Sequence, residues 1–287
     1  MSHRISYLKT VTCLPILVAA LTVLVLPQYH TAYSNDGETS ESIGSYTAGC
    51  IKNSVALPRD GKGYQVVRTG RGRYYANPET IDFIIDLAAK VNDNLDGILL
   101  IGDIAQQTGG PMPDDHSRHQ IGLEADIFFW QHPIAKQRPL TMLEREHTNP
   151  NSLLTADMTA IDPYKWEEVH GEILRLASED GRVDRIFVNP VIKRKLCGVY
   201  GDAGWLGKIR PWYGHDGHFH VRLKYPKGNY MCESQEPIEV NGSGCAADLQ
   251  AWFTDDGRVR KKRTSGSSVQ KKLPDACKPI MQSAGGN

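Results

Sequence analysis

The amino-acid sequence predicts an α+β fold in which an antiparallel sheet is flanked by helices. Segments with helical periodicity and short apolar segments typical of strands follow one another along the chain. They do so without the regular strand–helix–strand repetition that indicates a parallel sheet. The 287 residues are 40% hydrophobic, which is enough to bury the core of one substantial domain or of two small ones.

Three segments have the signals of helices. Asn77, Pro78 and Glu79 supply an N-cap, a proline in the first turn and an early acid, and apolar residues then follow at helical spacing. An amphipathic pattern predicts a second helix over residues 166–177, and a short third helix is predicted over residues 190–196.

Four short segments have the signals of strands: GILLIGD (97–103), EADIFFW (124–130), RIFVN (185–189) and HFHVRL (218–223). Alternation in the last one places His218, His220 and Arg222 on one face and apolar residues on the other. Between the first two strands, the Gly- and Pro-rich residues 106–122 predict a long loop. Long loops in compact domains are often functional.

The N-terminus has the pattern of an export signal. Arg4 and Lys9 precede an apolar run of 16 residues, 11–26, and Ala32 and Ser34 are small residues at the positions that a signal peptidase reads. We expect cleavage after Ser34. The run is shorter than the roughly 20 residues that span a bilayer, and an uncleaved anchor is the alternative.

The cysteine count is odd once the signal is removed. The chain has six cysteines, of which Cys13 lies in the signal. Export makes disulfides the natural interpretation of the other five, which contain no Cys-x-x-Cys pair. At least one thiol is therefore unpaired or bonded to another molecule.

The net charge of the chain does not indicate a polyanionic partner. Lys+Arg and Asp+Glu both total 33, which argues against nucleic acid and against stable membrane association after signal cleavage. Basic residues do crowd the Ser- and Gly-rich segment 258–272, which is interpreted as a solvated tail in preference to a contact with an anionic polymer.

One combination of residues points to metal chemistry. The predicted loop contains His116 and His119, Asp126 opens the strand that follows, and His220 lies on the later strand. Histidine and carboxylate suit Zn²⁺, and a site with three protein ligands, here His119, Asp126 and His220, leaves a fourth position for water. Taken singly, each residue has an ordinary explanation, such as a capping or ion-paired aspartate or a solvated histidine. The histidine face could also titrate as a pair or simply face solvent.

Other hydrolytic motifs are absent from the sequence or misplaced. There is no His-Glu-x-x-His and no Gly-x-Ser-x-Gly. Ser-x-x-Lys occurs at Ser6/Lys9 in the signal and at Ser268/Lys271 in the basic tail, without the partner motifs of serine enzymes. Both occurrences are interpreted as chance.

At this point the chain resembles a known family. His119-x6-Asp126 with a later His218-x-His220 is similar to the zinc peptidases grouped with lysostaphin, D-Ala-D-Ala peptidases and the hedgehog domain. The strings SIGSYTAGC, HSRHQIGLEADIF, RIFVNPVIKRKLC and KIRPWYGHDGHFHVRL narrow the resemblance to the penicillin-insensitive murein endopeptidases, from about Ser42 to Cys277. The resemblance implies the hedgehog/D-Ala-D-Ala metallopeptidase-like form of the α+β fold.

The resemblance also implies roles for the histidines. His119, Asp126 and His220 match the zinc ligands, and His218 matches the probable general base. His215 matches a site histidine that orients substrate or stabilises the oxyanion. His116 matches a further histidine at the metal, either a direct ligand or a residue behind the ligands. A second metal site of the family needs an Asp and a His, whose counterparts here are Asp157 and Ala160, so it is not expected.

The cysteines can be aligned in the same way. The resemblance implies disulfides Cys50–Cys277 and Cys197–Cys245, while Tyr225 stands where Cys232 would find its partner. Cys232 is therefore expected to be the free thiol, in agreement with the odd count.

These implications give a complete functional expectation. Residues 1–34 are a signal peptide, 35–45 a polar leader, 46–255 a zinc metallopeptidase domain and 256–287 a basic tail tied back by Cys277. The expected activity is hydrolysis of D-alanyl to meso-diaminopimelyl cross-links of peptidoglycan in the Gram-negative periplasm, insensitive to β-lactams. The alternatives are a zinc-containing wall-binding module and a D-Ala carboxypeptidase. The sequence leaves a homodimer open.

Overall fold

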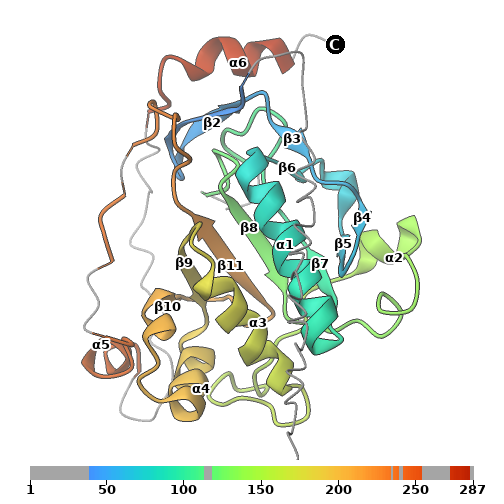
Figure 1. The fold of residues 1–287 in the computed structure, drawn as a ribbon, viewed down its shortest axis with the longest axis vertical. Coiled ribbons are helices and arrows are strands. Elements are labelled where there is room, and N and C mark those ends of the chain that lie inside the picture. Colours follow the sequence, from blue (N-terminus) through green and yellow to red (C-terminus); the bar gives the residue numbers. More distant parts are fainter. Residues whose placement is uncertain (1–38, 113–117, 234, 239–241, 254–271, 285–287) are drawn as a thin grey trace, which may run out of the picture. The chain divides into compact units, whose positions relative to one another are not determined.

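The computed structural model of the protein describes residues 39–112, 118–233, 235–238, 242–253 and 272–284 (Figure 1). All of them belong to one compact unit, Tyr33–Asn287. The predicted signal peptide and its predicted cleavage site lie outside the described residues, as does His116. Among the helices that were described, none has the length and apolar character to cross a bilayer.

A seven-stranded sheet forms the centre of the unit. Its order is β10 (Ile209–Pro211), β9 (Val183–Val188), β11 (His218–Leu223), β8 (Glu124–Phe128), β7 (Leu99–Ile101), β5 (Tyr64–Val66) and β4 (Asp60–Gly61). The four middle strands pair antiparallel, as predicted, but β10 pairs parallel with β9 and β5 pairs parallel with β7. The α+β class is therefore confirmed with a mixed sheet. The hedgehog-like form stays a prediction.

The parallel pairs arise from two strand–helix–strand connections that the sequence analysis did not find. Along the chain, helix α1 (Pro78–Leu95) follows β5 and precedes β7, and helix α4 (Pro190–Tyr200) follows β9 and precedes β10. A parallel pair needs a crossover of this kind. β5 and β10 have only three residues each, too few for alternation to reveal them.

Three helices pack on one face of the sheet. Figure 1 shows α1 and α3 (Glu168–Glu179) side by side across it, and both contribute to one buried core with α4 and the inner sides of β8, β9 and β11. Phe219, Val221 and Leu223 point into this core and are fully buried. The alternation predicted for residues 218–223 is confirmed, and His218, His220 and Arg222 lie on the opposite face.

The predicted helices and strands are present with shifted ends. Asn77 caps α1 by accepting the N–H of Glu79, and Asn189 caps α4 by accepting the N–H of Val191. α3 begins two residues later than predicted and α4 runs on to Tyr200. Six further short elements are β3 (Val55–Ala56), β6 (Tyr75–Ala76), η1 (Thr69–Arg71), α2 (Met142–His147), η2 (Gly204–Lys208) and α5 (Ala247–Gln250).

A hairpin and the last helix lie together at one end of the chain's fold. Strands β1 (Glu41–Ser45) and β2 (Ala48–Lys52) pair antiparallel, and α6 (Cys277–Ala284) packs beside β2 (Figure 1). β1 lies within residues 35–45, the range expected for a polar leader. Its Ile43 is buried with Cys50 and Cys277, so this strand is part of the folded unit. The division into domains otherwise stays a prediction.

Both implied disulfides are present, Cys50–Cys277 and Cys197–Cys245. Cys232 is the free cysteine of the described residues, and its thiol donates to the carbonyl of Ser42. Burial raises the pKa of this thiol to about 12, so it stays protonated at neutral pH. Tyr225 stacks on Tyr46 at 5.2 Å between ring centroids.

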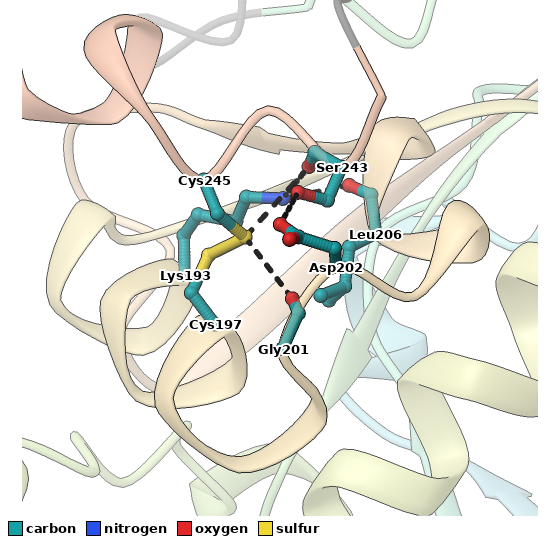
Figure 2. Close-up of a disulfide and its surroundings, with 7 residues drawn as sticks. All are labelled: Lys193, Cys197, Gly201, Asp202, Leu206, Ser243 and Cys245. Carbon is teal, nitrogen blue, oxygen red and sulfur yellow. Dashed lines mark hydrogen bonds between the residues drawn. A yellow bond between two sulfur atoms is a disulfide. The ribbon is translucent and has the colours of Figure 1, made fainter.

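A buried lysine supports the second disulfide. Lys193 of α4 is fully buried, and its ammonium donates to the carbonyls of Leu206 and Ser243, each at 2.7 Å (Figure 2). Burial, with the nearby Arg210, lowers the pKa of Lys193 to about 7. The bond to Ser243 fixes the segment that carries Cys245 against α4, and the bond to Leu206 ties the same helix to η2 (Gly204–Lys208).

Candidate metal centre

The candidate ligands converge on the polar face of the sheet. Antiparallel pairing places His220 of β11 directly opposite Asp126 of β8, and His119 enters from the loop that precedes β8. Asp126 Oδ1 lies 2.9 Å from His220 Nδ1 and 3.4 Å from His119 Nε2. All three side chains are buried. The structure therefore brings together the three residues that the sequence analysis selected.

The donor set fits a zinc ion. The three residues each offer one ligand atom, and these atoms lie within 4.8 Å of one another. Ligands at zinc distances in a tetrahedral site are about 3.3 Å apart, close to the separations found here. Two imidazoles and a carboxylate are also the mixed nitrogen and oxygen donors that zinc accepts, although other divalent metals of this class use the same set.

The charges within the cluster compensate each other without a metal. Burial would by itself lower the pKa of His119, but the carboxylates of Asp126 and Glu124 outweigh it and raise that pKa to about 9. Burial opposes ionisation of Asp126, yet His119 and His218 hold its pKa well below the usual value. The ionised carboxylate of Asp126 thus favours a positive charge at this cluster.

His218 lies at the open side of the cluster. Its Nε2 is 3.7 Å from Asp126 Oδ1, and its side chain is 25% exposed, against 2% for His119 and His220. Burial is the main reason that the pKa of His218 is lowered, and Asp126 only partly opposes it. The imidazole is consequently neutral at neutral pH and can accept a proton from a group in the site.

His215 faces His218, with ring centroids 5.1 Å apart. Its Nδ1 lies 2.8 Å from the carbonyl of Tyr213, which can only accept, so Nδ1 carries the hydrogen. Burial together with His220 and His218 lowers the pKa of His215 to about 3. A neutral His215 therefore presents an unprotonated Nε2, which can accept a hydrogen bond but cannot donate one.

Several residues of the site were missed by the sequence analysis. Glu124 is fully buried and contacts both His220 and Arg222. The guanidinium of Arg118 lies over the rings of Phe187 and Trp212. Glu124 shares the face of Asp126 by strand alternation, and this signal could have identified it.

Backbone contacts hold the ligand strand in place. The N–H of Asp126 donates to the carbonyl of Asp103, and the N–H of Gly102 donates to the carbonyl of Asp126. The side chain of Asp103 pairs with Arg71 and Arg73 at 2.8 and 2.9 Å. The start of the ligand-bearing strand is thereby anchored to the segment before α1.

Asp157 lies apart from this cluster. It is exposed and accepts hydrogen bonds from the hydroxyls of Thr155 and Thr159 in its own loop. The prediction that His116 contributes to the centre concerns a residue outside the described ranges.

Fold and site together define a candidate three-ligand metal centre with an open side, carried on the polar face of a mixed sheet. Residues 42–282 match the family described as penicillin-insensitive murein endopeptidase, and the chain belongs to that family.

The chain is similar to relatives of that name in three organisms. It is 42% identical to the one from Haemophilus influenzae over 77% of this chain and 75% of the relative. It is 38% identical to the one from Klebsiella pneumoniae, over 85% and 88% of the two chains. The relative from Citrobacter koseri is 34% identical over 93% and 95%.

Proposed function

We propose that this protein is a zinc metalloendopeptidase that hydrolyses peptide cross-links of peptidoglycan. The observation that carries the proposal is the convergence of His119, Asp126 and His220 in a buried cluster whose open side is lined by His218. Membership of the family and the names of its relatives supply the substrate class. The same likeness supports assigning the chain to the hedgehog-like fold group.

His119, Asp126 and His220 would hold the metal. Zinc bound by three ligands lowers the pKa of water at its fourth position to about 7 and polarises a carbonyl. His218 is neutral and borders the cluster. It takes a proton from the attacking water and then passes that proton to the leaving amine. The peptide bond breaks with one water consumed and no covalent intermediate on the protein.

His215 orients the substrate in this proposal. Because its Nδ1–H is engaged by Tyr213, its Nε2 is suited to accept an N–H of the substrate and not to stabilise an oxyanion. Of the two roles implied for this residue, orientation is therefore the one we assign.

The substrate bond and the compartment follow from the resemblance. We assign the D-alanyl to meso-diaminopimelyl bond, in the periplasm of a Gram-negative bacterium, after export by residues 1–34. Since neither serine nor cysteine attacks in this mechanism, β-lactams, which trap such nucleophiles, are expected to leave the activity unchanged.

Digestion of purified peptidoglycan tests the proposal. We expect the mature protein to convert cross-linked dimers into monomers, to lose this activity with a chelator and to regain it with added Zn²⁺. Products are identified by chromatography and mass. Cleavage of monomeric pentapeptide in preference to dimer would instead make the protein a carboxypeptidase. Intact dimers with zinc-loaded, folded protein would contradict hydrolysis and favour a wall-binding module.

A further inference from the structure

Glu124 is a buried carboxylate that the proposed mechanism does not use, yet it contacts two of the candidate ligands. Its Oε1 lies 2.8 Å from Nε2 of His220, and its Oε2 accepts the backbone N–H of His119 at 2.7 Å. The side chain has no exposed surface. One carboxylate thus connects the ligand on β11 to the ligand on the loop.

We propose that Glu124 is a positioning residue, which selects the tautomer of His220 and fixes the backbone of His119 so that both present a ring nitrogen to the metal. The inference rests on the proposed metal site. It adds a residue that orients the ligands without binding the metal itself.

The geometry at His220 carries the first half of the proposal. An ionised carboxylate can only accept, so its contact with Nε2 requires the hydrogen on that nitrogen. A neutral imidazole then has its lone pair on Nδ1, the nitrogen 2.9 Å from Asp126 Oδ1. The two ring nitrogens thus have separate partners, Nε2 facing Glu124 and Nδ1 facing the candidate ligands. A carboxylate behind a ligating imidazole is a known means of orienting it.

The contact with His119 carries the second half. His119 has a φ of 66°, in the left-handed region that non-glycine residues seldom occupy. The bond from its N–H to Glu124, five residues further along the chain, holds this conformation in the loop that precedes β8. His119 Nε2 is thereby directed at Asp126, 3.4 Å away.

Arg222 compensates the charge of the buried Glu124 carboxylate. Its Nε donates to Glu124 Oε1 at 2.7 Å, and its guanidinium lies over the ring of Tyr46 at 4.1 Å. The pair could alternatively serve the fold alone, as many buried ion pairs do. The two roles differ in what happens when the whole pair is replaced by apolar side chains.

A double variant, Glu124→Leu with Arg222→Met, separates these roles. Replacing both members of a buried ion pair by apolar groups is often neutral for stability, so we expect the metal-free melting temperature to stay within a few degrees of the wild type. Zn²⁺ affinity, measured on the full exported chain by competition with a chromophoric chelator, should fall about 10- to 100-fold. Unchanged affinity in the folded double variant would overturn the proposal.

Glu124→Gln provides a second variant in case the double variant does not fold. His220 and His119 contact different oxygens of Glu124, and in glutamine an NH2 group, which cannot accept, replaces one of these oxygens, so one of the two contacts is lost. We expect the same direction of change in Zn²⁺ affinity. Asp180→Asn is the matched control, because Asp180 is an ion-paired carboxylate that contacts Arg182 and no candidate ligand. Wild-type affinity in Glu124→Gln would overturn the proposal, and so would an equal loss of affinity in the Asp180→Asn control.

A direct readout is the tautomer of His220 in the zinc-loaded wild type, obtained from long-range proton–nitrogen NMR correlations. We expect the hydrogen on Nε2, and a hydrogen on Nδ1 would contradict the inference. These measurements are independent of hydrolysis. Tight zinc binding without cleavage of murein would refute the proposed function only, whereas cleavage with unchanged affinity in the Glu124 variants would refute only this inference.

Discussion

Two histidines of the centre have left-handed backbone conformations, His119 with φ 66° and His215 with φ 55°. Each such residue costs roughly 1–3 kcal/mol unless its surroundings hold it. Glu124 accepts the N–H of His119, and the carbonyl of His215 accepts the N–H of Asn189. The site therefore depends on contacts outside the proposed ligand set, and substitutions at those contacts will affect it indirectly.

His218 is the residue whose replacement best separates catalysis from metal binding. In His218→Ala we expect the rate of dimer cleavage to fall about 10²- to 10⁴-fold, because the general base is lost. Zn²⁺ affinity should change less than about threefold, since the three proposed ligands remain. Cleavage is measured on purified cross-linked dimer. His147→Ala, which removes an exposed histidine of α2, is the control; activity retained in His218→Ala would refute this assignment.

His170 provides a pH-dependent contribution to stability away from the centre. Burial lowers its pKa to about 4, although a bond with the backbone of Phe129 opposes the shift. An unfolded histidine titrates near 6.5. Between pH 6.5 and 4 the unfolded state binds more protons, so stability is complete above this window and is lost as pH falls through it.

His170→Gln should remove this dependence. The N–H of Glu167 donates to His170 Nδ1, at a helical position where glutamine makes the same bond. From pH 6.5 to 4.5, we expect the wild type to lose about 2 to 3 kcal/mol more unfolding free energy than the variant. Urea unfolding at a series of pH values measures the difference. Parallel stability curves would show that His170 already titrates normally in the folded protein.

At the scale of elements, the helix α4 and the site are joined at Asn189. Its side chain accepts the N–H of Val191, and its own N–H donates to the carbonyl of His215. In Asn189→Ala the cap is lost while the backbone bond remains, so we expect a loss of about 1 kcal/mol in unfolding free energy. Asn189→Ser keeps a capping oxygen and should lose less. Equal stability of the two variants in denaturant unfolding would argue that the cap contributes nothing.

The elements with the strongest local signals were predictable from sequence. α1 has a capping asparagine, a proline and regular apolar spacing, and β11 has six alternating residues, so local chemistry fixes both. β5 and β10 are defined by the strands beside them, and three residues carry too little periodicity. α6 is held against β2 by Cys50–Cys277, a contact between distant parts of the chain.

Asp126 and His220 were predictable because each has a ligating side chain and a strand position that alternation can assign, whereas His119 was selected by its chemical type within the predicted loop. The contact between Glu124 and the backbone of His119 was not predictable, since it depends on the left-handed conformation of the loop residue. The neutral state of His215 also could not be read from sequence. It depends on burial and on the carbonyl of Tyr213, which come from the folded chain.

At the scale of the whole molecule, metal binding should stabilise the fold. The donors of the cluster come from β8, β11 and the loop before β8, and unfolding separates them. Zn²⁺ at a free concentration of 1,000 times its dissociation constant should add about 4 kcal/mol to the unfolding free energy. Thermal unfolding in chelator and in buffered Zn²⁺ measures this as a rise in melting temperature. Asp126→Ala, which lacks one donor, should show little rise, and an equal rise would place the ion elsewhere.

The link between Cys50 and Cys277 also determines how the chain would respond to a protease. A single cut between residues 245 and 277 creates two polypeptides, but Cys277 remains bonded to Cys50, so the molecule stays in one covalent piece. Such a nicked protein would migrate as intact on a non-reducing gel and split only after reduction. In an oxidising compartment, one cut in this stretch would therefore leave α6 covalently attached beside β2.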